Sequence, residues 1–220
     1  MNKEYNNLDI TKKNVEREIL EARIYRNLLS NLIMGIRKSS FYNNHKEVFH
    51  YIEGTLETSY ILALCKIFAK SKEESLWKLL DLVRQVEDKT FENRLRSFPH
   101  APHEQLRQQR EKILHNISSY IERIQEVEEL LNPFRNTRRA HNFPLLIGKA
   151  REITYGQTEE WLDFAEEVFI AAMDGVCSSA CRVGDFIPQE LIYQMDSMVR
   201  TIKAVDSYER ARNYNSGYGR

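Results

Sequence analysis

The densest cluster of residues able to do chemistry lies between Phe134 and His141, which reads Phe-Arg-Asn-Thr-Arg-Arg-Ala-His. It packs three guanidinium groups and one imidazole into a single short segment. Guanidinium groups are permanently charged and present a planar fork of donors that matches phosphate oxygens. The residue types therefore favour a site that binds an anion.

Asn132-Pro133, just before this cluster, resembles a helix start with Asn as the cap and Pro at the first position. A short helix over 134–141 would begin there, and its first free amides would attract phosphate. Arg135 and His141 are six positions apart, which places them about 120° from each other around a helix. Their joint action requires the Arg135 side chain to swing along the axis, or a second subunit to complete the site.

The segment Arg135-Asn136-Thr137-Arg138-Arg139-Ala140-His141 resembles the signature of the HEPN superfamily, an Arg followed by a polar residue and later a His. Two further segments resemble its abortive-infection AbiU branch. The apolar stretch 60–72, followed by Ser75-Leu76, is similar to a helix and helix start of that branch. Ile153-Thr154-Tyr155-Gly156 is similar to what the branch places after its His. The resemblance covers about residues 15–175 and gives no support beyond Gly184.

The resemblance implies a helical domain that cleaves or binds RNA as a homodimer, with two copies of the motif facing each other in a shared cleft. His141 would act as general base on the ribose 2′-hydroxyl or as acid to the leaving oxygen, because imidazole titrates near pH ~6.5. Arg135 would stabilise charge on the phosphate. Asn136 would orient the His or the phosphate. Such cleavage needs no metal or other cofactor and gives a 2′,3′-cyclic phosphate and a 5′-hydroxyl.

Two residues of the cluster, Arg138 and Arg139, lie outside the HEPN pattern. They are expected to contact the RNA backbone, or else to form a solvated face. The main alternative function is a non-catalytic HEPN module that binds RNA, a nucleotide or a protein partner of the antitoxin type. A third is a structural helical adaptor that uses the long apolar seam between Leu106 and Leu131.

Hydrophobic periodicity predicts the elements that carry these residues, as an all-α bundle of six or seven helices. Ser75 is expected to cap a short helix and Thr158 a later one, while the prolines between Ser97 and His103 mark a connection. The helix over 103–131 is expected to pack on the second helix in a coiled-coil-like way. The predicted helices cover residues 11–38, 49–67, 76–83, 103–131, 134–141, 158–176 and 188–205. We expect one domain over 1–210 and a disordered tail over 211–220.

Bulk composition excludes several classes of protein. The 32 basic and 32 acidic residues cancel, so a polyanion must be attracted by a local cluster. Cys65, Cys177 and Cys181 fit neither a zinc ribbon nor a disulfide framework. His100 and His103 make an incomplete zinc site. Without a signal peptide or membrane span, we expect a cytoplasmic protein that does not bind membranes.

Overall fold

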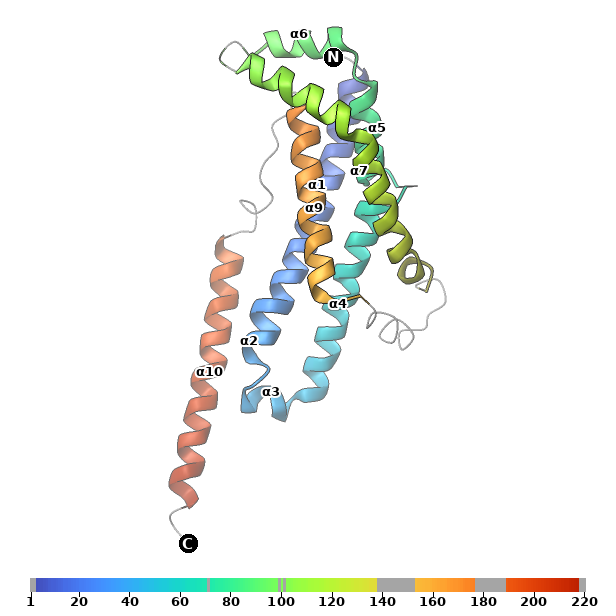
Figure 1. Ribbon diagram of the computed structural model, residues 1–220. Coiled ribbons are helices and arrows are strands. Elements are labelled where there is room, and N and C mark those ends of the chain that lie inside the picture. Colours follow the sequence, from blue (N-terminus) through green and yellow to red (C-terminus); the bar gives the residue numbers. More distant parts are fainter. Residues whose placement is uncertain are drawn as a thin grey trace.

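The computed structural model (Figure 1) describes residues 3–70, 72–98, 100, 102–137, 153–176 and 189–217. Within these ranges the regular structure is helical and contains no strand, which confirms the all-α prediction. The elements are α1 (Lys3–Asn27), the π-helical turn η1 (Leu28–Ile33), α2 (Met34–Ile36), α3 (Ser40–Asn44), α4 (Lys46–Phe68), α5 (Leu76–Gln85), α6 (Asp88–Arg96), α7 (His103–Thr137), α9 (Tyr155–Asp174) and α10 (Gln189–Gly217).

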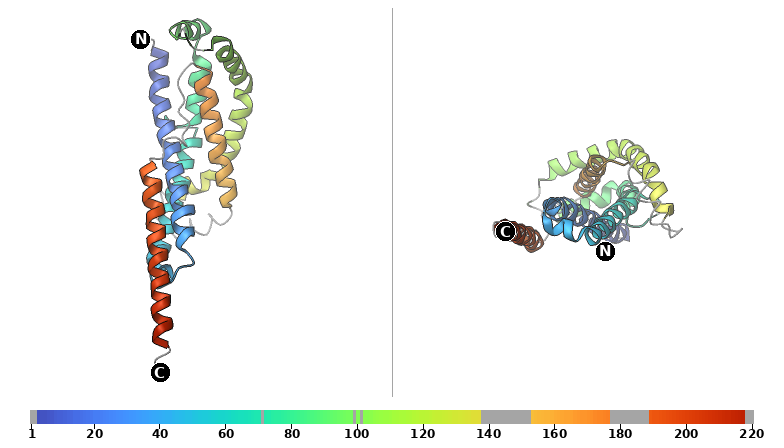
Figure 2. Two further views of the ribbon diagram at one scale, coloured as in Figure 1. Left: turned by 90° about the vertical axis from the view of Figure 1, so that its left-hand side faces the viewer. Right: turned by 90° about the horizontal axis from the view of Figure 1, so that it is seen from below.

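The centre of the bundle is the pair α1 and α4, which run side by side along most of their length (Figures 1 and 2). One face of α1 buries Leu8, Val15 and Ile19 completely, at the spacing of an amphipathic helix. The second half of α4 is apolar nearly all round, and α1, α7 and α9 cover it. Its central position follows from that composition, because every face must leave water.

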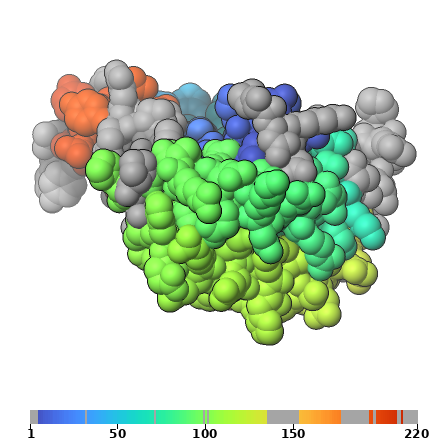
Figure 3. All heavy atoms as spheres, turned by 90° about the horizontal axis from the view of Figure 1, so that it is seen from above, coloured from blue at the N-terminus to red at the C-terminus, as the bar shows by residue number. Residues whose placement is uncertain are grey.

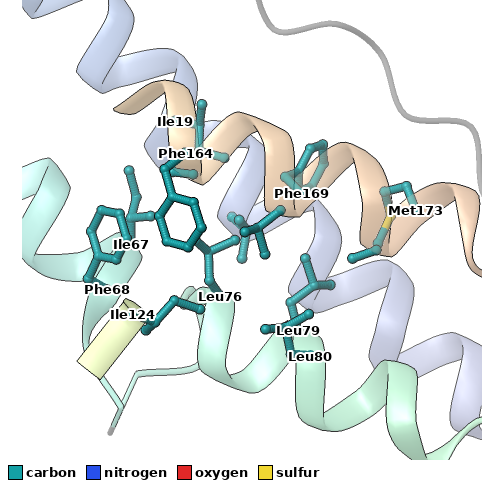
Figure 4. Close-up of a cluster of buried hydrophobic side chains, with 14 of the residues drawn as sticks. Ile19, Ile67, Phe68, Leu76, Leu79, Leu80, Ile124, Phe164, Phe169 and Met173 are labelled. Atoms are coloured by element: carbon teal, nitrogen blue, oxygen red, sulfur yellow. The ribbon is translucent and has the colours of Figure 1, made fainter. Parts of the chain in front are cut away.

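Side chains of α1, α4, α5, α6, α7 and α9 meet in one core, part of which is shown in Figure 4. The rings of Phe68 on α4 and Phe164 on α9 stack with centroids 6.3 Å apart and planes 11° from parallel. Ile124 of α7 and Leu79 of α5 join them, and both are fully buried. Each such side chain contributes roughly 1.5–3 kcal/mol of hydrophobic free energy relative to exposure.

Helix α7 packs on α4 through its predicted seam, with Ile117, Ile124 and Leu131 buried. Its first half crosses the end of the bundle together with α6, and the two form the near surface in Figure 3. The buried Arg110 ties this end together, donating to the Val86 carbonyl at 2.6 Å and to the Asp88 carboxylate at 3.0 Å. Helix α6 was not predicted, because its nine residues bury only Phe91 and Leu95.

Two predicted helix caps have different outcomes. The Ser75 hydroxyl accepts from the Lys78 amide at 3.3 Å, as expected. The Thr158 cap is wrong, since α9 begins four residues earlier at a capping box between Thr154 and Gln157. The Gln157 amide donates to the Thr154 hydroxyl, and the Gln157 side chain accepts from the Thr154 amide, so two helix-end donors are satisfied at once.

Helix α10 runs to Gly217, past the end of its apolar pattern at Val205, and takes in most of the tail that was expected to be disordered. It lies along η1, α2 and α3 and projects beyond them (Figure 2). Ile202 enters a second small apolar cluster with Ile36 and Phe49, and the Asp206 carboxylate accepts from the Ser40 amide. The single-domain boundary at 210 stays a prediction.

In the described part of the chain, no helix is both long enough and apolar enough to cross a bilayer. Cys65 is buried on α4, whereas Cys177 and Cys181 lie outside the described residues.

Candidate functional site

The motif predicted from sequence begins in the last turn of α7, where Arg135 and Asn136 lie just before the helix end at Thr137. Arg138, Arg139 and His141 fall outside the described residues. The structure thus positions the start of the motif, and the pairing of Arg135 with His141 stays a prediction.

The helix start predicted at Asn132-Pro133 is wrong, because α7 continues through Pro133 without a break. A proline inside a helix removes one hydrogen bond and crowds the preceding turn. Here Leu131 and Phe134 flank the proline and are both buried, so packing fixes the chain on either side of it. Pro133 itself is exposed. Tertiary burial therefore outweighs the local signal for a new helix.

This continuity changes the electrostatics of the site. A helix start at Pro133 would have offered free amides and a positive dipole end to a phosphate. Instead, Arg135 lies at the carboxyl end of a 35-residue helix, where the dipole is negative and stabilises cations. The described end of α7 therefore offers no helix amino terminus to a bound anion.

Helix α4 holds both described flanks of the motif segment. Before the segment, the Cys65 thiol donates to the Leu131 carbonyl of α7 at 3.6 Å. After it, the buried Tyr60 hydroxyl donates to the Thr158 carbonyl of α9 at 2.9 Å. Tyr60 and Cys65 are five positions apart, about 7.5 Å along the α4 axis. The apolar half of α4 thereby contacts α7 six residues before its end and α9 in its first turn.

Helix α9 is also held by cations of α1. Arg23 donates to Glu166 and to Asp163 at 2.5 Å each, and Arg26 forms an ion pair with Glu159. Burial alone would lower the pKa of Arg23, but the hydrogen bonds to the two carboxylates outweigh it and raise that pKa above its ordinary value. These pairs orient α9 and leave the two arginines engaged within the protein.

A cavity of about 500 Å³ opens beside this start of α9. Among its polar lining residues, Glu53 of α4 accepts from the Tyr42 hydroxyl of α3 at 3.3 Å and pairs with Arg37, just after α2, at 3.5 Å. Partial burial raises the pKa of Glu57, and the like charge of Glu53 raises it further, against the effect of Arg37. The cavity is lined by Leu29, Arg37, His50, Glu53, Gly54, Glu57, Tyr60, Ile61, Ile153, Tyr155 and Thr158.

Burial raises the pKa of Tyr60 to about 12, although its hydrogen bond to Thr158 opposes the shift. Tyr60 is therefore a neutral hydrogen-bond donor at ordinary pH. It is 2% exposed and belongs to the core, as its place on an apolar seam suggests.

Sequence reasoning missed this cavity. The available signal was a polar stripe on α4, with His50, Glu53 and Glu57 at intervals of three and four on one helix face. The stripe shows that these side chains lie together, but it does not show what closes over them.

The HEPN family model described as AbiU2 matches residues 8–196. The match includes the motif at 135–141 and also extends past Gly184, where the sequence resemblance ended. Searches of curated proteins and of solved structures each find no match.

Proposed function

The chain belongs to the AbiU2 family of HEPN proteins, and from this premise we propose that it is a metal-independent endoribonuclease of bacterial defence or stress response. The observation that carries the proposal is that the family match spans the whole segment holding Arg135, Asn136 and His141. The packing of α7 and α9 on α4 supports it, because the helices before and after that segment are held by one rigid element.

In the proposed reaction, the ribose 2′-oxygen attacks the adjacent phosphorus. His141 takes the proton from the 2′-hydroxyl as the new oxygen–phosphorus bond forms and the bond to the 5′-oxygen breaks. The leaving 5′-oxygen receives a proton, from the imidazolium of the second motif in a dimer or from water. The nucleophile is already tethered beside the phosphorus, so positioning supplies much of the rate.

The other motif residues have supporting roles in the proposal. Arg135 binds the phosphate oxygens as negative charge builds on them, a role suited to a permanently charged fork donor. Asn136 orients the phosphate or the imidazole through its amide. Arg138 and Arg139 contact neighbouring phosphates of the RNA backbone.

The test is cleavage of end-labelled RNA in the presence of EDTA. The wild-type chain should produce fragments with a 2′,3′-cyclic phosphate. His141→Ala should lower the rate by ~10²–10⁴-fold, and Arg135→Ala by ~10²–10³-fold. His115→Ala is the matched control, because His115 is an exposed histidine of α7 outside the motif and its loss should change nothing.

Binding of RNA without cleavage would contradict the proposal and favour the non-catalytic module. If the wild-type chain neither bound nor cleaved RNA, the structural adaptor would be favoured.

A further inference from the structure

We propose that the cavity between η1, α4 and the start of α9 receives one nucleobase of the RNA, a guanine held at its Watson–Crick edge by Glu57. The inference rests on the proposed function for the identity of the polymer. The cavity and its chemistry stand on the structure alone. Its volume of about 500 Å³ falls within the ~300–1,000 Å³ typical of small-molecule sites.

One residue that lines the cavity is a glycine in the interior of a helix. Gly54 lies in the middle of α4, where a glycine costs about 1 kcal/mol relative to alanine. A Cβ atom added at Gly54 would meet nothing within 4 Å, so no neighbouring helix requires the missing side chain. At Gly175, by contrast, a Cβ would lie 2.3 Å from Ile113, and close packing explains the glycine. Gly54 keeps one wall of the cavity bare, as close approach of a ligand to backbone requires.

The carboxylate of Glu57 also lines the cavity. Among the described residues Glu57 has no hydrogen-bond or ion-pair partner, whereas its neighbour Glu53 is engaged by Tyr42 and Arg37. Partial burial and the charge of Glu53 raise the pKa of Glu57. Glu57 is exposed, so water satisfies its carboxylate in the free protein. A ligand with N–H donors would replace that water with direct hydrogen bonds to the carboxylate.

Guanine is the base whose edge fits this acceptor. Its N1–H and N2–H donors are adjacent and can meet the two oxygens of one carboxylate, as RNA-binding proteins read exposed base edges. Adenine and cytosine place an acceptor beside their single donor group, and uracil places its donor between two acceptors, so each would oppose a carboxylate oxygen. The apolar walls, Ile61 and Ile153, and the ring of Tyr155 offer surfaces for the base plane.

The rim of the cavity can hold the phosphate that follows the base. Arg37 and His50 are both exposed there and line the cavity. Ile153 and Tyr155 belong to the chain that resumes after the segment carrying His141. Ile153 is twelve positions after His141 in the sequence.

The experiment measures binding of guanosine monophosphate and adenosine monophosphate to the full chain by calorimetry, without any cleavage reaction. Guanosine monophosphate should bind at least ~10-fold more tightly than adenosine monophosphate. Glu57→Gln should weaken it by at least ~10-fold, since hydrogen bonds to a charged group contribute about 1.5–3 kcal/mol. Gly54→Leu should abolish binding by filling the cavity. Glu111→Gln, an exposed glutamate of α7 that does not line the cavity, is the matched control.

Circular dichroism melts show whether each variant folds. If Gly54→Leu fails to fold, the test depends on Glu57→Gln. Equal binding of the two nucleotides, no binding, or binding that Glu57→Gln leaves unchanged would overturn the guanine site. Its failure is separate from that of the ribonuclease. Cleavage of RNA without binding of guanosine monophosphate would contradict only the base site. Binding of guanosine monophosphate without cleavage of RNA would contradict only the ribonuclease proposal.

Discussion

At the scale of single residues, Lys66 is a charged residue in the apolar half of α4, and its ion pair explains its presence there. Its ammonium lies 2.8 Å from the carboxylate of Glu18 on α1, whose side chain is only 2% exposed. Arg17 reaches the other oxygen of Glu18 at 3.2 Å from the surface. A buried carboxylate without a partner is costly, so a charge in the apolar half of α4 stabilises the contact of α1 with α4.

Lys66→Met should therefore destabilise the fold, even though it makes α4 more hydrophobic. Removing one partner of a buried pair costs about 3–5 kcal/mol, and the remaining Arg17 reduces the expected loss to roughly 2–3 kcal/mol. Urea unfolding followed by circular dichroism measures it. The double variant Glu18→Leu with Lys66→Met should recover most of the loss, because no charge then stays unpaired. A single variant as stable as wild type would show that the pair is dispensable.

The candidate site was predictable from sequence only in part, and Arg135 and Glu57 show why. The cluster around Arg135 is visible because its residue types are unusual and close together in sequence. Glu57 belongs to a site assembled from α4, the turn near Arg37 and the start of α9, which are far apart in sequence. Hydrophobic periodicity identifies the buried face of α4, but it carries no information on which elements close over the polar face.

At the scale of elements, the long pattern of α7 was a reliable guide, whereas of three short signals only the Ser75 cap was confirmed. The seam of α7 repeats over many turns, and its packing on α4 is as predicted. Asn132-Pro133 and Thr158 are signals of one or two residues. Burial of Leu131 and Phe134 overrode the first, and the capping box at Thr154 replaced the second. Local preferences of about 1 kcal/mol yield to packing that contributes several times as much.

Pro133→Ala tests the continuity of α7. In an unbroken helix the alanine restores an amide that can bond to the carbonyl four residues earlier, and the stability should rise by about 1–3 kcal/mol. At the first position of a new helix, the same change would bring no gain, because that amide has no partner there. Thermal unfolding measures the difference. The exposed Leu130→Ala on the same helix is a control for a change of surface apolar area.

At the scale of the whole molecule, the proposed reaction needs Arg135 and His141 at the same phosphate, and a single chain does not readily place them together. Arg135 lies at the carboxyl end of a helix, and its separation of six positions from His141 does not favour a shared helix face. Two-fold symmetry is the commonest way for a chain to pair with itself, and in a symmetric pair Arg135 of one chain can meet His141 of the other. We therefore expect a homodimer, which size exclusion with light scattering detects at micromolar concentration.

Mixing two inactive variants tests whether the site is shared between chains. Arg135→Ala chains and His141→Ala chains are each expected to be inactive alone. After exchange of subunits, about half of the dimers are mixed, and each mixed dimer has one pairing of an intact Arg135 with an intact His141 from the other chain. Cleavage of labelled RNA should return to about a quarter of the wild-type rate, whereas mixing either variant with itself restores nothing. If the mixture stayed inactive while light scattering showed that the subunits had exchanged, each site would have to draw both residues from one chain, and the swing of Arg135 along the axis of α7 would be the way in which they meet.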